Sequence, residues 1–314
     1  RRGAQAAAAG TGRGRRLIEP GIHLVHKPVG GTSFAIVKDF MRAAREVGQG
    51  KLAIGHGGTL DPFADGLLLI LVGQATRLME FMHPLPKTYE ATVAWGVETE
   101  TCDHMGVVVS EDDASALTPE RLDAALQGFL GWRDQIPPAT SAKKIGGEAA
   151  YKKAHRGEEV VLPPSRVYLH EAAWLSHELP KQSVLRITCR GGFYVRSLAR
   201  DLGRTLGCGA HLAALHRTAI GPWRDPGLDK SEVIAGEALI AWGRARRLDE
   251  DEVRRLGMGQ PISLGALEPP AWPLPEGFPD PAAPIRALHE GKLMALLKEA
   301  DGGLRTFANL RGGI

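Results

Sequence analysis

The strongest constraint on the fold is an unbroken aliphatic run from Leu67 to Val72, which directly follows Gly66. A short continuous apolar run bounded by a turn signal predicts a strand buried in a sheet. The run is far shorter than the ~18–20 apolar residues that span a bilayer, and no signal-peptide core is visible. We therefore expect a globular protein built around this strand, with no membrane partner.

The rest of the chain mixes strand and helix patterns. Apolar residues alternate, as in strands, over 89–97, 107–110 and 184–189. Helical spacing and capping residues predict helices over 34–47, 118–129 and 195–206. Ser33 and Thr118 are the expected N-caps, and 107–110 is the expected partner strand of 89–97. Because strands and helices follow no regular βαβ order, we expect an α+β fold with a mixed sheet.

Composition divides the chain into three parts. Residues 1–20 form a basic arm, whose first sixteen residues hold five arginines and no acid. Such a segment cannot build a core, so we expect disorder there, either as a solvated tail or as an arm that touches RNA. Eight of the 21 prolines fall within 261–284, and three short strand-like segments follow them. We therefore expect a main domain over 21–247 and a small β domain over 248–314.

Charge and cysteine content narrow the function classes. The net charge is +3, but the basic arm accounts for the excess, so any nucleic acid must be met by local basic patches. The three cysteines, with no C-x-x-C pair, argue against a disulfide framework or a zinc knuckle and favour a reducing cytoplasm. No cluster has the spacing of metal ligands, so we expect neither a metal nor another cofactor.

The segment from Gly55 to Gly66 is the first candidate for chemistry. It reads G-H-G-G-T-L-D-P-F-A-D-G and ends where the apolar run begins. Its glycines permit a tight turn close to a ligand, and Pro62 stiffens the chain after Asp61. A carboxylate held there can act as a nucleophile or a general base. The alternative is an ordinary Asp-Pro turn in which Asp61 is only a local cap.

Two further segments place aromatic and basic residues together. Lys87 and Tyr89 begin a predicted strand, where a tyrosine can stack on a base or simply pack in the core. Tyr194 and Arg196 begin the predicted helix 195–206, on which arginines recur at 196, 200 and 204. This arginine stripe predicts either an anion site at the start of the helix or a solvated helix face.

A fourth segment, 135–160, is rich in cations and suits contacts with phosphates. The basic residues expected to bind RNA here are Lys143, Lys144, Lys152, Lys153 and Arg156.

Taken together, these segments resemble the bacterial type of the TruB family of tRNA pseudouridine synthases. The matching motifs are K-P-x-G-x-T-S at 27–33, G-H-x-G-x-L-D-P at 55–62, K-x-Y at 87–89, Q-x-P-x-x-S-A-x-K at 135–144, G-x-Y-x-R at 192–196 and D-L-G-x-x-L-G-C-G-A-H-x-x-x-L at 201–215. They follow the order and spacing of the family from residue 22 to about 220. The resemblance implies the pseudouridine synthase fold, with a largely antiparallel sheet flanked by helices and a C-terminal PUA-like, RNA-binding domain.

The resemblance also implies an activity and a site. The family isomerises the uridine at position 55 of the tRNA T loop to pseudouridine after flipping the base out. Asp61 matches the catalytic aspartate, and Arg196 matches the arginine that pairs with it. The residues that match the positions holding the target nucleotide are His56, Tyr89, Tyr194 and the backbone of Leu215, and Lys87 is expected to contact RNA. The segment 135–160 is expected to be a mobile lid, or thumb, that grips the tRNA. We expect tRNA as the partner of a monomer, with no protein partner.

The chain departs from the family pattern at several places, two of which, Gly57 and Asp65, lie in the segment of Asp61, and three rival predictions remain. The family has threonine where this chain has Gly57 and Asp65, and an inward Asp65 would oppose RNA close to Asp61. The rival predictions are a non-catalytic RNA-binding or RNA-folding factor on the same scaffold, a glycoside hydrolase that uses Asp61 and Asp65 as its carboxylates, and a guide-RNA-dependent relative.

Overall fold

The computed structural model describes residues 17–141, 143–145, 148–150, 156, 158, 160 and 162–314. The chain forms two compact units. Unit 1 runs to Leu85 and resumes at Ala219, whereas unit 2 comprises Pro86–Thr218. The predicted basic arm, residues 1–16, lies outside the described residues.

Unit 1 contains the predicted buried strand at the centre of an antiparallel sheet. Its strands are β1 (Gly21–Lys27), β2 (Ile54–His56), β3 (Asp65–Val72), β13 (Trp223–Arg224) and β14 (Ser231–Ile234). β3 pairs with both β1 and β2, and β1 also pairs with β14. Residues Leu67 to Val72 are fully buried, which confirms the strand expected from the aliphatic run.

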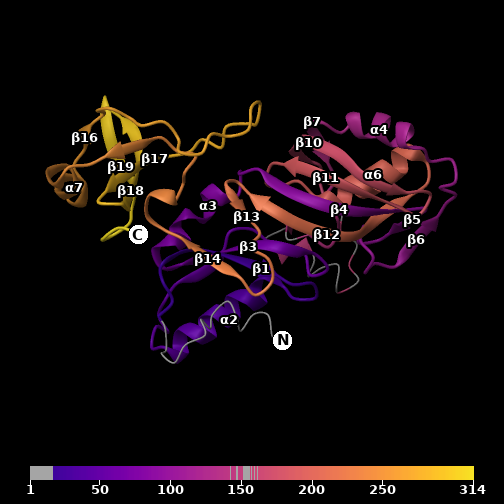
Figure 1. Ribbon diagram of the computed structural model, residues 1–314, viewed down its shortest axis with the longest axis horizontal. Helices are drawn as coiled ribbons and strands as arrows, with labels where there is room; N and C mark the ends of the chain where they lie inside the picture. Colours follow the sequence, from indigo (N-terminus) through magenta and orange to yellow (C-terminus); the bar gives the residue numbers. More distant parts are fainter. Residues whose placement is uncertain are drawn as a thin grey trace. The chain divides into compact units, whose positions relative to one another are not determined.

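Helix α2 (Ser33–Glu46) covers one face of this sheet (Figure 1). Its apolar side, which includes Phe40, packs on the side chains of β1 and β3 that point the same way, including Ile70. The N-cap is Thr32, whose hydroxyl accepts from the Ala35 amide at 3.1 Å. The expectation that Ser33 caps the helix was wrong, because the Ser33 hydroxyl is bonded to the backbone of Leu60 instead.

The C-terminal part of unit 1 forms a five-stranded sheet in the order β15-β17-β18-β19-β16. Its elements are η2 (Gly236–Ala238), β15 (Ala245–Arg247), α7 (Glu250–Gly257), β16 (Ile262–Ser263), β17 (Ile285–His289), β18 (Lys292–Ala300) and β19 (Gly303–Asn309). The three predicted C-terminal strands are confirmed, and the predicted domain start at 248 follows β15. That boundary stays a prediction, because this sheet shares one apolar core with β1, β3, η1 (Gly73–Leu78) and α3 (Met79–Met82).

Unit 2 is built on an antiparallel sheet in the order β12-β4-β11-β10-β7. Its elements are β4 (Lys87–Trp95), β5 (Val97–Thr99), β6 (Val108–Glu111), α4 (Pro119–Gln127), β7 (Gly131–Gln135), β8 (Lys144–Ile145), β9 (Glu148–Ala149), β10 (Ser165–Glu178), β11 (Gln182–Cys189), α6 (Val195–Leu206) and β12 (Ala210–Ile220). Helices α4 and α6 lie next to each other, and α6 also contacts β4 (Figure 1). The α+β class with largely antiparallel sheets is confirmed.

Two local predictions in unit 2 have different outcomes. Thr118 caps α4, with Pro119 in its first turn, as expected. The strand predicted at 107–110 does not pair with β4. It is β6, which pairs with β5, so that Val97 lies opposite Glu111. The reason is Gly96, whose positive φ of 89° ends β4 and turns the chain before β5.

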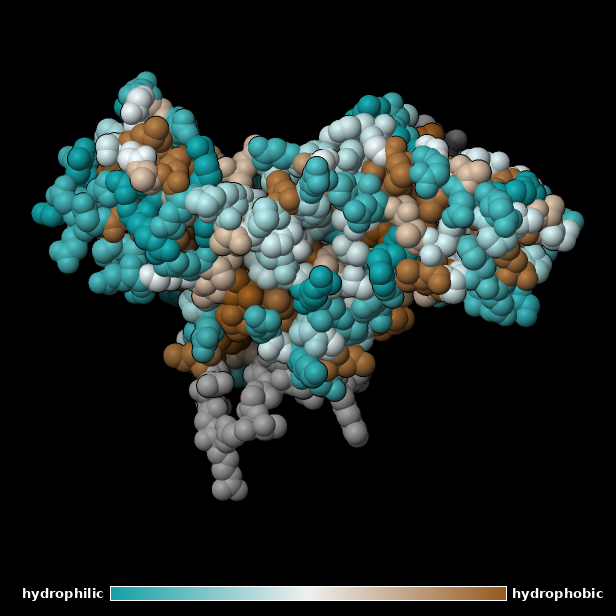
Figure 2. Space-filling view, turned by 45° about the horizontal axis from the view of Figure 1, so that its top comes forward, coloured by the Kyte–Doolittle hydropathy of each residue, from teal (hydrophilic) through white to brown (hydrophobic). Residues whose placement is uncertain are grey.

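The face of the molecule in Figure 2 is mostly polar, with hydrophobic residues gathered in separate patches. No helix among the described residues is both long and apolar enough to cross a membrane.

Candidate active site

Asp61 lies in the loop of unit 1 that joins β2 to β3. Its carbonyl accepts from the Ala64 amide at 3.1 Å, which closes a tight turn just before β3 begins. The Asp61 side chain is half-buried. The predicted candidate therefore lies on a constrained turn beside a rigid strand, as a nucleophile requires.

Ser33 fixes the residue before Asp61. The Ser33 hydroxyl accepts from the Leu60 amide at 2.9 Å and donates to the Leu60 carbonyl at 3.1 Å. Ser33 is itself buried in the first turn of α2. Because one hydroxyl makes both backbone bonds, the segment that leads into Asp61 cannot shift without breaking two buried hydrogen bonds.

The residue after Asp61 is fixed from the same motif. The Gly30 amide donates to the Pro62 carbonyl at 2.7 Å. The buried Lys27 ammonium donates to the carbonyls of Pro28 at 2.9 Å and Gly31 at 2.8 Å, which holds the turn that carries Gly30. The K-P-x-G-x-T-S motif therefore bonds to the residues on both sides of Asp61, Leu60 through Ser33 and Pro62 through Gly30.

His56 ends β2, where it pairs in register with Ile70. The two departures from the family pattern have local explanations. At Gly57, an added Cβ would lie 3.2 Å from both Leu69 and Leu71, so the position is crowded. Asp65 begins β3, and its Oδ2 lies 3.8 Å from His26 Nε2.

Lys87 and Tyr89 occupy the buried face of β4 in unit 2. Lys87 is only 6% exposed and lies opposite Cys189 on β11. Burial, together with the charge of Arg217, lowers the pKa of Lys87 to about 7. The predicted contact of Lys87 with RNA stays a prediction. Leu215, on β12, is also buried.

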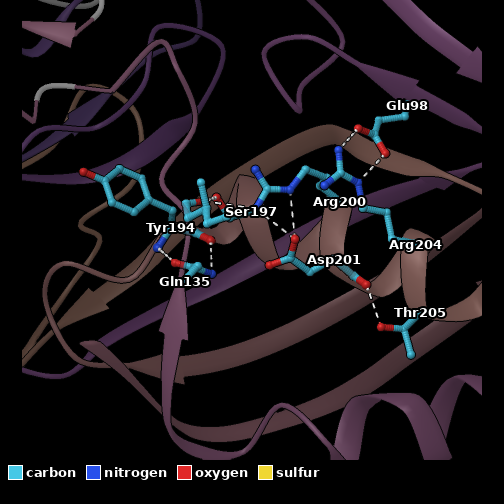
Figure 3. Close-up of polar contacts among 9 residues, drawn as sticks. Glu98, Gln135, Tyr194, Ser197, Arg200, Asp201, Arg204 and Thr205 are labelled. Carbon is cyan, nitrogen blue, oxygen red and sulfur yellow. Dashed lines mark hydrogen bonds and ion pairs between the residues drawn. The ribbon is translucent and has the colours of Figure 1, made fainter. Parts of the chain in front are cut away.

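Tyr194 is held through its backbone by Gln135, at the end of β7 (Figure 3). The Gln135 amide nitrogen donates to the Tyr194 carbonyl at 3.0 Å, and its oxygen accepts from the Tyr194 amide at 2.9 Å. In Figure 3 the phenol ring points away from these bonds. The backbone is therefore fixed while the hydroxyl stays directed elsewhere.

Arg196 is buried and pairs with Asp103, a residue that the sequence reasoning did not single out. Its Nη1 lies 3.3 Å from Asp103 Oδ2, and both side chains are about 5–6% exposed. The same nitrogen donates to the Thr101 carbonyl at 3.0 Å and the Thr140 hydroxyl at 2.8 Å. Since Asp61 belongs to the other unit, its predicted pairing with Arg196 stays a prediction.

Asp103 is itself oriented by its own loop. The Thr101 hydroxyl and the Met105 amide both donate to Asp103 Oδ1, at 2.7 Å and 3.0 Å. Cys102 between them has a φ of +59°, a left-handed conformation that is uncommon outside glycine. The tight T-E-T-C-D-H-M-G segment, rich in threonine and closed by a glycine, is the sequence signal that could have identified Asp103.

Two of the three arginines in the stripe of α6, Arg196 and Arg200, are buried. Arg200 Nη2 and the Ser197 hydroxyl donate to the Ile136 carbonyl, at 3.0 Å and 2.8 Å. Of the three arginines, Arg204 alone is exposed, and it forms a bidentate ion pair with Glu98 (Figure 3). The predicted solvated face was wrong for Arg196 and Arg200, because both are buried and bind the chain that leads out of β7. The predicted anion site at the start of the helix stays a prediction.

The predicted lid is described only in part. Lys143 donates to the Ser165 hydroxyl, and the exposed Arg156 pairs with Glu158 at 2.6 Å. Lys144 begins β8, while Lys152 and Lys153 lie outside the described residues. The RNA contacts predicted for these residues stay predictions.

No group of three or more His, Cys, Asp or Glu side chains that could hold a metal ion occurs in the part of the chain that the structure describes. The expectation that no cofactor is used stays a prediction.

Comparisons with known proteins cover the segments that contain these residues. Residues 45–195 match the family model described as TruB family pseudouridylate synthase (N terminal domain). Residues 196–256 match that of the tRNA pseudouridylate synthase B C-terminal domain. The chain is 36% identical to tRNA pseudouridine synthase B of Arthrobacter sp. (strain FB24), covering 90% of this chain and 94% of the relative.

Two further likenesses extend this result. The chain is 42% identical to tRNA pseudouridine synthase B of Xanthomonas campestris pv. campestris (strain 8004) over 70% of this chain and 68% of that protein. Its fold is similar to a chain in the crystal structure of a Cbf5-Nop10-Gar1 complex, with a TM-score of 0.65. That match covers 92% of this chain and 84% of the other at 20% identity, so it shows the fold alone.

Proposed function

The chain belongs to the TruB family of pseudouridine synthases, and on that basis we propose that it isomerises uridine 55 in the T loop of tRNA to pseudouridine. The observation that carries the proposal is the Asp61 turn, which Ser33 and Gly30 hold on both sides. Within this family, that turn carries the aspartate on which the reaction depends.

The reaction breaks the N1–C1′ glycosidic bond of uridine and forms a C5–C1′ bond to the same ribose. Nothing is oxidised or hydrolysed, so the chemistry requires a nucleophile and a proton acceptor but no redox cofactor. Asp61 is the proposed nucleophile, toward the ribose or the base. The target base must leave the folded loop, at an unstacking cost of a few kcal/mol. We propose that His56 fills the space that the base leaves in the loop and that Tyr89 stacks on the extruded uracil.

After the base has rotated, a proton must leave C5 as the new bond is completed. We assign Tyr194 to this step, directly or through a hydrogen-bonded network. The two hydrogen bonds between the Gln135 side chain and the Tyr194 backbone support the assignment, because they fix the position from which the phenol ring projects. The proposed partner of Asp61 is Arg196, whose guanidinium is oriented by Asp103 and Thr140.

The segment that leaves β7 is the proposed start of a lid over the tRNA. Its first residues are anchored to α6, because Ile136 is bound by Ser197 and Arg200, and Thr140 by Arg196. Because the base of the lid is bonded to α6, a movement of the lid on binding RNA would be transmitted to the helix that carries Arg196. We also propose that the chain acts in the cytoplasm as a monomer and that tRNA is its only partner.

The test is pseudouridine mapping by mass spectrometry in unmodified tRNA incubated with the pure protein. We expect modification at position 55 only, and none in a tRNA with cytidine at that position. Asp61→Asn should abolish the product while leaving tRNA affinity within about threefold, because the amide keeps the shape and loses the nucleophile. Asp123→Asn, on the exposed face of α4, is the matched control and should keep the wild-type rate.

An inactive wild-type protein that still binds tRNA would instead favour the non-catalytic RNA-binding alternative. Product formed by Asp61→Asn would remove Asp61 from the role of nucleophile.

A further inference from the structure

Two exposed apolar side chains lie next to the residues that fix the Asp61 turn. Val29 is 63% exposed and Phe34 is 53% exposed, which makes Phe34 the most exposed phenylalanine of the chain. Single apolar residues are common on a protein surface, but these two adjoin the two anchors of one turn. Val29 directly precedes Gly30, and Phe34 directly follows Ser33. Apolar surface is therefore presented beside both residues that hold the neighbours of Asp61.

A cation accompanies the Phe34 ring. Phe34 and Lys38 lie one turn apart on the exposed face of α2, and the Lys38 ammonium is 5.2 Å from the centre of the ring. The next residue of the helix, Asp39, is bonded to Arg42 at 2.8 Å. An aromatic ring and an ammonium thus stand together at the surface. This combination binds single-stranded nucleic acid, since the ring stacks on a base and the cation contacts a phosphate.

The hydrogen bonds of Ser33 place this pair close to Asp61. One peptide unit joins Phe34 to Ser33, and the Ser33 hydroxyl bonds to both backbone groups of Leu60, the residue before Asp61. All of these residues belong to unit 1. The turn before Ser33 is open, because an added Cβ at Gly31 would meet no atom within 4 Å. A macromolecular ligand bound at Asp61 is therefore within reach of the Phe34 ring.

A nucleobase suits this surface better than a protein does. When a target uridine leaves its loop, the bases beside it lose a stacking partner. An exposed aromatic ring can replace that partner, because every base has a face that stacks. A stable protein interface buries roughly 800 Å² on each side, which is far more than two apolar side chains supply.

We propose that Phe34 stacks on an unpaired base beside the flipped uridine of the tRNA T loop, and that Lys38 binds the adjoining phosphate. The inference rests on the proposed function and adds a binding residue to it. It predicts that position 34 requires an aromatic ring. It also predicts that the contribution of the ring disappears when the RNA lacks the base on which it stacks.

The experiment measures the affinity for a T-arm stem-loop RNA in an Asp61→Asn background, which serves as the parent. We expect Phe34→Ala and Phe34→Leu to weaken binding by about tenfold, the scale of one base stack, and Phe34→Tyr to stay within about threefold of the parent. Abasic nucleotides are then placed at each loop position in turn. At one position the parent and Phe34→Ala should bind equally well. Lys38→Gln should reduce the slope of log affinity against log salt by roughly 0.7–0.9.

Leu228→Ala is the matched control. Leu228 is 61% exposed and lies in unit 1 between β13 and β14, so this variant loses exposed apolar surface away from the motif. It should bind the RNA as the parent does. Thermal unfolding of every variant separates a lost contact from a folding defect. Phe34→Leu keeps the apolar character of the side chain and decides the question if Phe34→Ala fails to fold.

A folded Phe34→Leu variant with the affinity of the parent would overturn the inference, because the aromatic ring would then be dispensable. So would a loss of affinity in Phe34→Ala that persists at every abasic position, because no single base would then be the partner of the ring. A wild-type protein that binds the RNA but forms no pseudouridine would refute the proposed function instead, while the binding comparison would still test Phe34.

Discussion

Replacing Lys87 by methionine should remove a pH dependence from the stability of this protein. Lys87 is 6% exposed, and burial together with the charge of Arg217 lowers its pKa from 10.5 to about 7. Between these two values the unfolded chain holds the proton and the folded chain does not. Unfolding then takes up a proton, so the free energy of unfolding rises with pH by ~1.4 kcal/mol per pH unit.

The assay is urea unfolding of wild type and Lys87→Met across about two pH units above neutrality. The difference in free energy of unfolding between the two should grow with pH by roughly 2–3 kcal/mol in favour of wild type. Burial raises the pKa of the Cys189 thiol, opposite Lys87, to about 12, so the thiol lowers stability as the pH approaches 9 and above. Because both proteins contain this thiol, its contribution cancels in the difference between them. Lys181→Met is the matched control: its side chain is 79% exposed, and its curve should run parallel to wild type.

Parallel curves for wild type and Lys87→Met would refute this reasoning. They would mean that Lys87 keeps its proton in the folded state throughout the range. A difference that shrinks with rising pH would reverse the sign and imply that the folded state stabilises the charged form.

Other substitutions test the anchoring of the site. Ser33→Ala should cost about 1–3 kcal/mol in urea unfolding and slow single turnover, because both polar backbone groups of Leu60 lose their partner. Gln135→Glu keeps the acceptor for the Tyr194 amide but loses the donor to its carbonyl, so the rate should fall by roughly tenfold. Asp103→Asn keeps the shape of the side chain but removes the negative charge that lies 3.3 Å from Arg196 Nη1. Single turnover should fall by at least about tenfold, and a wild-type rate would show that the reaction does not depend on this ion pair. Gly203→Ala should destabilise the fold by about 3 kcal/mol in urea, since its Cβ would lie 2.3 Å from the Ala210 amide nitrogen.

The sequence predicted those parts of the fold that depend on neighbouring residues. The aliphatic run before Gly73 identified β3, the Thr118-Pro119 cap identified α4, and the apolar spacing after Tyr194 identified α6. In each case the signal and the structure lie within a few residues of each other. The pairing of β6 was missed because a single left-handed turn at Gly96 decides which strand it meets.

The polar contacts of the site were harder to predict, because they join residues far apart in the chain. Arg200 reaches the carbonyl of Ile136, and Arg196 reaches Asp103 and Thr140. Spacing alone shows that these arginines share a helix face, but it does not show that a loop covers that face. The same limit applies to Ser33, which is as suitable for an N-cap as for the buried bonds that it makes.

Ser33 and Gln135 solve one physical problem in the same way. Each side chain donates to the carbonyl and accepts from the amide of a single residue, Leu60 or Tyr194. Reciprocal bonding of this kind fixes the position of the backbone and satisfies both of its polar groups. It also needs a neutral group that is both donor and acceptor, which a carboxylate or an ammonium is not. The residue types at 33 and 135 are therefore dictated by the backbone that they hold, at Leu60 just before Asp61 and at Tyr194 itself.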